Sequence, residues 1–195
     1  MTARWALAAF LALQGLVALA WVFAAGPAIG EVGAAGWRRN DAQLWSSSGP
    51  GLGGEMIDPF NHLLTATLLL LASAASAFMS RQDFLAGGSA RACLYLGAGL
   101  GLAAIGVWLI SAEWTKPLVF PAGFPDLALV FAATRAFIAQ FFIGYLVLIV
   151  CLAQVAMGGA TEGRPGFFHL AIFNWWVVVA AWVVIFGLFY ALPML

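Results

Sequence analysis

The two histidines, His62 and His169, are the residues whose chemistry is easiest to name, because membrane-embedded histidines can ligate haem iron. Each of them opens a different apolar stretch of the chain. In a chain that crosses the membrane repeatedly, those two positions fall on opposite sides of a hydrocarbon core about 30 Å thick. They therefore cannot ligate one haem together. Each could ligate haem with a residue of a partner subunit, although a polar residue at a helix end is the commoner situation. We expect this chain alone to bind no haem and no metal.

The two cysteines give no redox or metal motif. Cys93 and Cys151 are not part of a CxxC pair or of a His/Cys cluster with metal-ligand spacing. Both fall toward the predicted cytoplasmic side, where thiols stay reduced, and we expect small buried apolar residues. The sequence also contains no phosphate-binding glycine loop and no nucleic-acid signature, so we expect no nucleic-acid partner.

Polar residues inside the apolar stretches are more informative. Arg135 lies eight residues into one stretch, which places it about 12 Å deep at 1.5 Å per residue. An arginine at a helix centre costs about 2.5–3.5 kcal/mol on insertion scales, so it normally faces a partner or a polar cavity. We predict a contact with a phosphate or carboxylate; the alternative is snorkelling to the headgroups. Gln14, Gln140 and Asn174 lie in other parts of the apolar stretches, and no Asp, Glu or Lys lies mid-span, which disfavours an autonomous pump.

Tryptophan is unusually frequent, with nine copies alongside sixteen phenylalanines in 195 residues. Trp175 and Trp182 are seven positions apart and therefore share one helix face. This face is large and rigid, and we expect it to pack on another protein.

These residues must be positioned by membrane-spanning helices. The chain has only 8 Lys or Arg and 8 Asp or Glu, and 64% of it is hydrophobic. About 20 apolar residues cross a bilayer, and a backbone in lipid must form its own hydrogen bonds. The sequence predicts an all-α polytopic membrane helix bundle, a single membrane domain of five transmembrane helices. The predicted spans are residues 5–25, 61–79, 92–112, 127–155 and 168–192.

The first stretch, 5–25, could instead be a signal peptide. Its apolar run of about 21 residues is longer than a typical signal core of 7–15, so we interpret it as an uncleaved span. The glycine pattern Gly97–Gly101 and Gly106 lie inside the third span and are expected to allow close helix packing.

Basic residues near the span ends predict the orientation. The difference between the two sides is one base, and it favours a cytoplasmic N-terminus, an external C-terminus and an external loop over residues 26–60. The basic residues on the predicted cytoplasmic side are Arg4, Arg81, Arg91 and Arg164; those on the other side are Arg38, Arg39 and Lys116.

Several of these segments resemble the third subunit of haem-copper oxidases. The family's last helix carries Trp-His-Phe-x-Asp-Val-Val-Trp. Trp175 and Trp182 match its tryptophans, whereas Trp176 stands at the histidine and Val179 at the aspartate. The resemblance is to the short five-helix form of bacterial quinol and cytochrome c oxidases, which includes third-subunit-like proteins encoded with nitric oxide reductases.

The resemblance extends to three further segments. The family's preceding helix carries Thr-Gly-x-His-x-x-His-Val-x-x-Gly; Thr134 and Gly144 match, and Gln140 stands at the second histidine. The ending Ser111-Ala112-Glu113-Trp114 is similar to the family's Gln-x-x-Glu-Tyr. The segment Asp58-Pro59-Phe60-Asn61 resembles its Pro-x-x-Asn-Thr entry to a span.

The resemblance implies a non-catalytic accessory subunit of a respiratory complex in the bacterial inner membrane. Its partners would be the catalytic haem-copper subunit, other membrane subunits and phospholipids, with haem and copper held by the partner subunits. Gln14 takes the place of the family's first-helix carboxylate, which puts a role in proton uptake in doubt. The residues expected to contact lipid or a partner are Arg135, Gln14, Gln140, Asn174, Glu113, Trp175 and Trp182.

Two other functions remain open. The chain could be a membrane anchor that binds haem b or quinone in another electron-transfer complex. It could also be a small transporter, which the lack of inverted repeats and of intramembrane acids disfavours.

Overall fold

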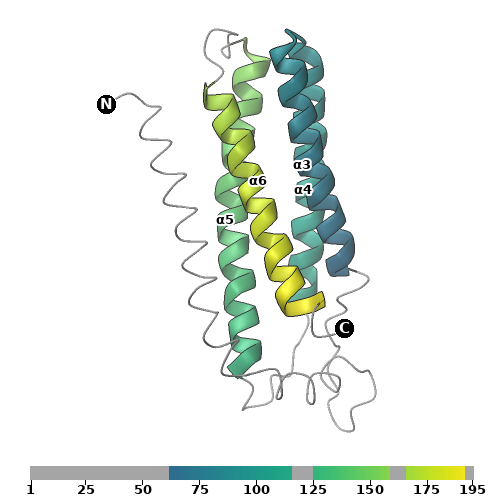
Figure 1. The fold of residues 1–195 in the computed structure, drawn as a ribbon, viewed down its shortest axis with the longest axis vertical. Coiled ribbons are helices and arrows are strands. Elements are labelled where there is room, and N and C mark those ends of the chain that lie inside the picture. The colour runs from purple at the N-terminus through teal and green to yellow at the C-terminus, as the bar shows by residue number, and fades with distance from the viewer. Residues whose placement is uncertain (1–61, 116–124, 159–165, 192–195) are drawn as a thin grey trace, which may run out of the picture.

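A computed structural model of the chain describes residues 62–115, 125–158 and 166–191. These residues form four long α-helices, α3 (Leu64–Leu85), α4 (Ser89–Thr115), α5 (Pro125–Ala156) and α6 (Gly166–Phe186). A short π-helical segment, η2 (Gly187–Ala191), follows α6 directly. The helices run alternately up and down along the long axis of the molecule (Figure 1).

All four helices are long and apolar enough to cross a membrane. The spanning segments are Leu64–Leu85, Ser89–Glu113, Ala133–Ala156 and Gly166–Phe186. This confirms the all-helical, multi-pass architecture expected for the described part of the chain. The predicted first span, 5–25, and the loop 26–60 lie outside the described residues.

The connection between α3 and α4 is much shorter than predicted. The predicted spans 61–79 and 92–112 leave residues 80–91 between them, but only Ala86, Gly87 and Gly88 separate the two helices. Gly87 has a φ of 80°, which a residue with a side chain rarely adopts, and its N–H donates to the Phe84 carbonyl. The charges of this segment suggested a loop, but nothing breaks the helix before the glycines.

Small residues let α3 and α4 pack closely. A Cβ added at Gly99 would lie 3.1 Å from the Ser73 carbonyl oxygen, and one at Gly106 would lie 3.3 Å from the Ala66 carbonyl oxygen. The expected packing role is thus confirmed for Gly106 and for Gly99 of the Gly97–Gly101 pattern. At Gly97 and Gly101 an added Cβ would meet none of the described residues within 4 Å, so the structure shows no close contact there.

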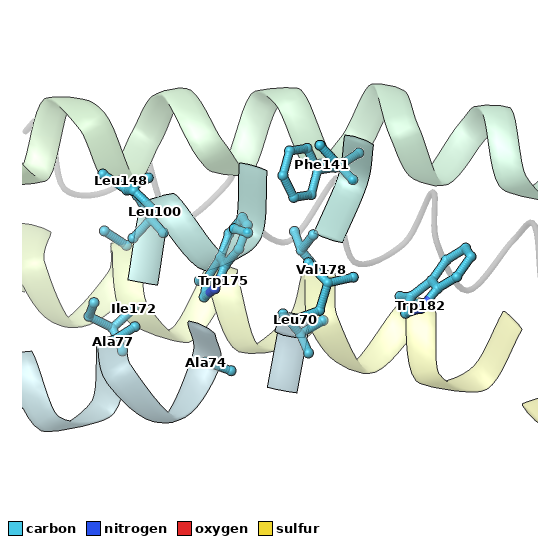
Figure 2. Close-up of a cluster of buried hydrophobic side chains, with 14 of the residues drawn as sticks. Leu70, Ala74, Ala77, Leu100, Phe141, Leu148, Ile172, Trp175, Val178 and Trp182 are labelled. Carbon is cyan, nitrogen blue, oxygen red and sulfur yellow. The ribbon is translucent and has the colours of Figure 1, made fainter. Parts of the chain in front are cut away.

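The core lies between the helices and is built from one stripe of each. α3 packs against α4 and α6, and α5 packs against the same two helices. Figure 2 shows side chains of α6, such as Trp175 and Ile172, lying between the smaller Ala74 and Ala77 of α3 and the large side chains of α5, such as Phe141. The small surface of α3 therefore accommodates the aromatic surface of α6.

Candidate functional site

The two tryptophans of α6 are anchored inside the bundle. Trp175 Nε1 donates to Ser73 Oγ and Trp182 Nε1 donates to Thr67 Oγ1, each at 2.9 Å. Both indoles are 0% exposed. We expected this face to pack on another protein, but it packs on α3 of the same chain. An indole N–H buried away from water requires an acceptor, and the hydroxyls of α3 supply one at each level.

Aromatic side chains of α5 cover the other side of these indoles. The Phe137 ring centroid lies 4.8 Å from that of Trp182, and the Phe141 centroid lies 5.4 Å from that of Trp175. Gly144 leaves room for α6, because a Cβ there would lie 3.0 Å from Val178 Cγ2. The motif residues Gly144, Trp175 and Trp182 thus act together in the α5–α6 contact.

A buried carboxylate of α4 contacts His62, two residues before α3, at one end of the bundle, which we name the Glu113 end. Glu113 is 0% exposed, and its Oε1 is hydrogen-bonded to Nδ1 of His62, whose side chain is 49% exposed. The imidazole therefore lies between the buried carboxylate and the surface. Glu113 was expected to contact lipid or a partner, whereas the structure buries it within the chain.

A second polar contact lies near this end. The Thr134 hydroxyl donates to the Val130 carbonyl at 2.9 Å, and its oxygen lies 3.1 Å from the Tyr190 hydroxyl. Tyr190 is fully buried in η2, so this contact ties the segment after α6 to α5. The motif residue Thr134 therefore has a structural role in the bundle.

The opposite end of the bundle, the Arg81 end, holds the other histidine. Arg81 Nε donates to His169 Nδ1 at 2.9 Å, which links the end of α3 to the start of α6. The rings of Phe84 and Phe168 stack beside this contact with centroids 4.6 Å apart. The two histidines thus lie at opposite ends of α3, as the spacing of the spans predicted.

Two amide side chains lie within the spans without a matching acceptor. Gln140 Nε2 and Asn174 Nδ2 are both shielded from solvent, and neither has a hydrogen-bond partner among the described residues. Asn174 is only 3% exposed, and its Nδ2 would lie 3.4 Å from a Cβ at Gly144. Gln140 is half-buried and lies at the edge of the buried face of α5. Among the buried side-chain nitrogen and oxygen atoms of the described residues, these two have no hydrogen-bond partner.

Arg135 is on the outside of the bundle. It follows the start of α5 at Pro125 by ten residues, or about 15 Å along the helix axis, and its side chain is exposed. The prediction that Arg135 meets a phosphate or carboxylate stays a prediction. Gln14, the last of the expected contact residues, lies outside the described residues.

Within residues 62–115, 125–158 and 166–191, no group of three or more His, Cys, Asp or Glu side chains could hold a metal ion. Cys93 and Cys151 are free thiols, the first half-buried and the second buried. The polar groups brought together are pairs that join helices. His62 with Glu113 and Arg81 with His169 are the pairs that sequence reasoning missed, because each joins residues far apart in the chain.

Comparison with protein-family models finds no match for this chain, and comparison with curated proteins finds none either.

Proposed function

We propose that this chain is a non-catalytic accessory subunit, similar to subunit III, of a haem-copper oxidase-type respiratory complex. It would span the bacterial inner membrane five times, with the N-terminus in the cytoplasm and the C-terminus outside. Its role would be to stabilise the catalytic subunit and to hold lipid at the contact. Haem and copper would belong to the partner subunits.

This proposal rests on the positions of the motif residues in the bundle. Thr134, Gly144, Trp175 and Trp182, which carry the resemblance, all lie in contacts between α3, α5, α6 and η2. The motif residues therefore build a scaffold rather than a reaction site. A scaffold whose outer surface is apolar suits a subunit that packs beside others in the membrane.

One observation favours the second candidate, a membrane anchor that binds haem b. The Glu113 carboxylate holds Nδ1 of the half-exposed His62, which leaves Nε2 as the ring nitrogen available to a ligand. A carboxylate behind a histidine is the common support for a metal-ligating imidazole. His169 is less suited, because its Nδ1 accepts from Arg81 and the neutral ring must then carry its proton on Nε2.

Purification of the native complex in mild detergent, through an affinity tag on this chain, distinguishes the two candidates. The accessory-subunit proposal expects a haem-copper catalytic subunit to co-purify, identified by mass spectrometry and by its haem spectrum. It also expects the separated chain to show no haem b band in a reduced-minus-oxidised spectrum. Isolation of the chain with its own b-type haem, lost in His62→Ala, would favour the anchor instead.

A further inference from the structure

The least covered helix of the bundle is α5. In its most apolar part only 28% of the residues are buried inside the bundle, compared with 39% in α3, 39% in α4 and 44% in α6. The outer face of α5 consists of large exposed side chains at helical spacing, namely Phe142, Ile143, Leu146, Ile149 and Val150. Lipid alone could cover such a surface, so its exposure does not identify an occupant.

The polar residue Gln140 indicates what kind of segment covers this face. It lies between the buried and outer faces of α5, three residues before Ile143, and its Nε2 is shielded from solvent but has no acceptor among the described residues. A polar N–H without an acceptor in an apolar region costs about 1–3 kcal/mol. Acyl chains offer no acceptor at the level of Gln140, which is near the middle of the 32-residue helix α5 and seven residues inside its spanning segment Ala133–Ala156. The occupant should therefore bring a polar side chain to this depth within the membrane.

The chain itself contains such a segment. In residues 5–25 the only hydrogen-bonding side chain apart from the indoles of Trp5 and Trp21 is Gln14. Gln14 lies within one residue of the middle of that stretch, as Gln140 does in α5. Two glutamine amides at one depth can each donate to and accept from the other, and such hydrogen bonds join helices in membranes.

We propose that residues 5–25 pack on the outer face of α5 and that Gln14 and Gln140 hydrogen-bond to each other there. The intervening residues 26–61 are long enough to reach any side of the bundle, so the glutamine pair, and not chain length, selects this face. The packing rests on the proposed five-span architecture, since both glutamines must lie within the membrane. It gives Gln14 a contact inside the chain in place of the lipid or partner contact expected above.

Cysteine cross-linking of the full chain in native membranes tests this packing. In a Cys93→Ala, Cys151→Ala background, Gln14→Cys is combined with Gln140→Cys or, as a control, with Trp176→Cys. Trp176 is 42% exposed at the middle of α6 and therefore presents a thiol at similar depth on another helix. A bifunctional methanethiosulfonate reagent links the thiols, and cleavage at a protease site placed in the 26–60 loop shows whether the two fragments stay joined.

The expected result is a link from position 14 to position 140 at least ten-fold more abundant than the link to position 176. A preference for position 176, no link to either, or a dimer linked through Gln140→Cys of two copies would overturn the packing. Stability gives a second readout if the cysteine variants assemble poorly. Gln14→Leu and Gln140→Leu should each change the thermal midpoint, and the double variant should change it by less than the sum.

The architecture is checked separately. A Ser47→Cys variant should react with a membrane-impermeant maleimide added from outside. If that labelling fails, the five-span proposal is wrong; if it succeeds and the cross-link fails, only the packing on α5 is wrong.

Discussion

The α3–α4 pair and the α5–α6 pair solve the same packing problem with different residues. Between α3 and α4 the contact uses glycine, alanine and serine, and Ser80 Oγ donates to the Ala92 carbonyl across the interface at 2.7 Å. Between α5 and α6 it uses aromatic rings, and the two amides without acceptors belong to these helices. The first pair is therefore complete in itself, whereas the second depends on other elements to complete it.

This difference has a physical origin. Lipid offers no hydrophobic driving force between helices, so association depends on close packing and hydrogen bonds. Small residues bring the backbones of α3 and α4 close and leave carbonyl oxygens accessible to serine. The rings of α5 and α6 keep most of their backbones farther apart, and the indole N–H groups of α6 donate to α3 instead. We therefore expect larger side chains to destabilise the α3–α4 contact and smaller side chains to destabilise the α5–α6 contact.

The largest expected effect is from Trp182→Ala. It removes a fully buried indole and leaves Thr67 without its donor, which should destabilise the bundle by about 3–5 kcal/mol. Unfolding in detergent micelles, followed by near-ultraviolet circular dichroism, measures the change. Trp176→Ala is the matched control, since Trp176 is 42% exposed, and its effect should stay within about 1 kcal/mol. Equal losses in the two variants would contradict the internal packing of α6.

The next effect tests the other pair. Gly99→Leu places a side chain 3.1 Å from the Ser73 carbonyl oxygen, and this overpacking should cost about 1–3 kcal/mol. Gly101→Leu adds the same volume where nothing lies within 4 Å and should be close to neutral. The same unfolding assay compares them. A larger loss at Gly101 would mean that this glycine, and not Gly99, supports a close helix contact in the assembled protein.

The features of this structure that depend on composition and on the lengths of the apolar stretches were predicted from the sequence. The apolar stretches gave the four helices of the described region, and their alternation placed His62 and His169 at opposite ends. The ends of α3 and α4 were less accurate because Arg81 and Asp83 look like loop residues. Arg81 instead lies within the last turns of α3 and donates to His169.

The contacts of single side chains were harder to predict, because they depend on rotation about the helix axis. The seven-residue spacing of Trp175 and Trp182 shows that they share a face, but it does not show whether that face points inward. A signal was available in α3, where the hydroxyls of Thr67 and Ser73 lie six residues apart in an apolar stretch and can accept from indole N–H groups. The His62–Glu113 contact had no such signal, since it depends on the packing of α3 against α4.

A smaller effect is expected at the Glu113 end. His62→Ala removes the imidazole from the buried Glu113 and should cost about 1 kcal/mol, because His62 is half exposed and part of the contact is replaced by water. Glu113→Gln keeps the shape of the side chain and should reduce the penalty of removing His62. A double-mutant cycle on the thermal unfolding of the chain measures this coupling. Strict additivity of the two changes would show that the pair does not hold α3 to α4.

The smallest effect on the stability of the bundle, and the most informative one for function, is expected from Arg135→Leu. The Arg135 side chain is exposed on α5, the less complete pair, so its removal should change unfolding by less than about 0.5 kcal/mol. A guanidinium in a membrane suits a bidentate contact with phosphate or carboxylate, so the yield of the native complex and its bound anionic lipid should fall together.

Arg91→Leu provides the matched control for that measurement. Arg91 is also exposed, but it lies in the first turn of α4, where water can solvate the guanidinium. Quantitative lipid mass spectrometry and the ratio of this chain to its partner subunits should therefore be unchanged. If Arg135→Leu also left lipid content and assembly unchanged, the predicted contact of Arg135 with anionic lipid or a partner subunit would be wrong. Packing on the outer face of α5 would then depend on apolar contacts and on a hydrogen bond of Gln140.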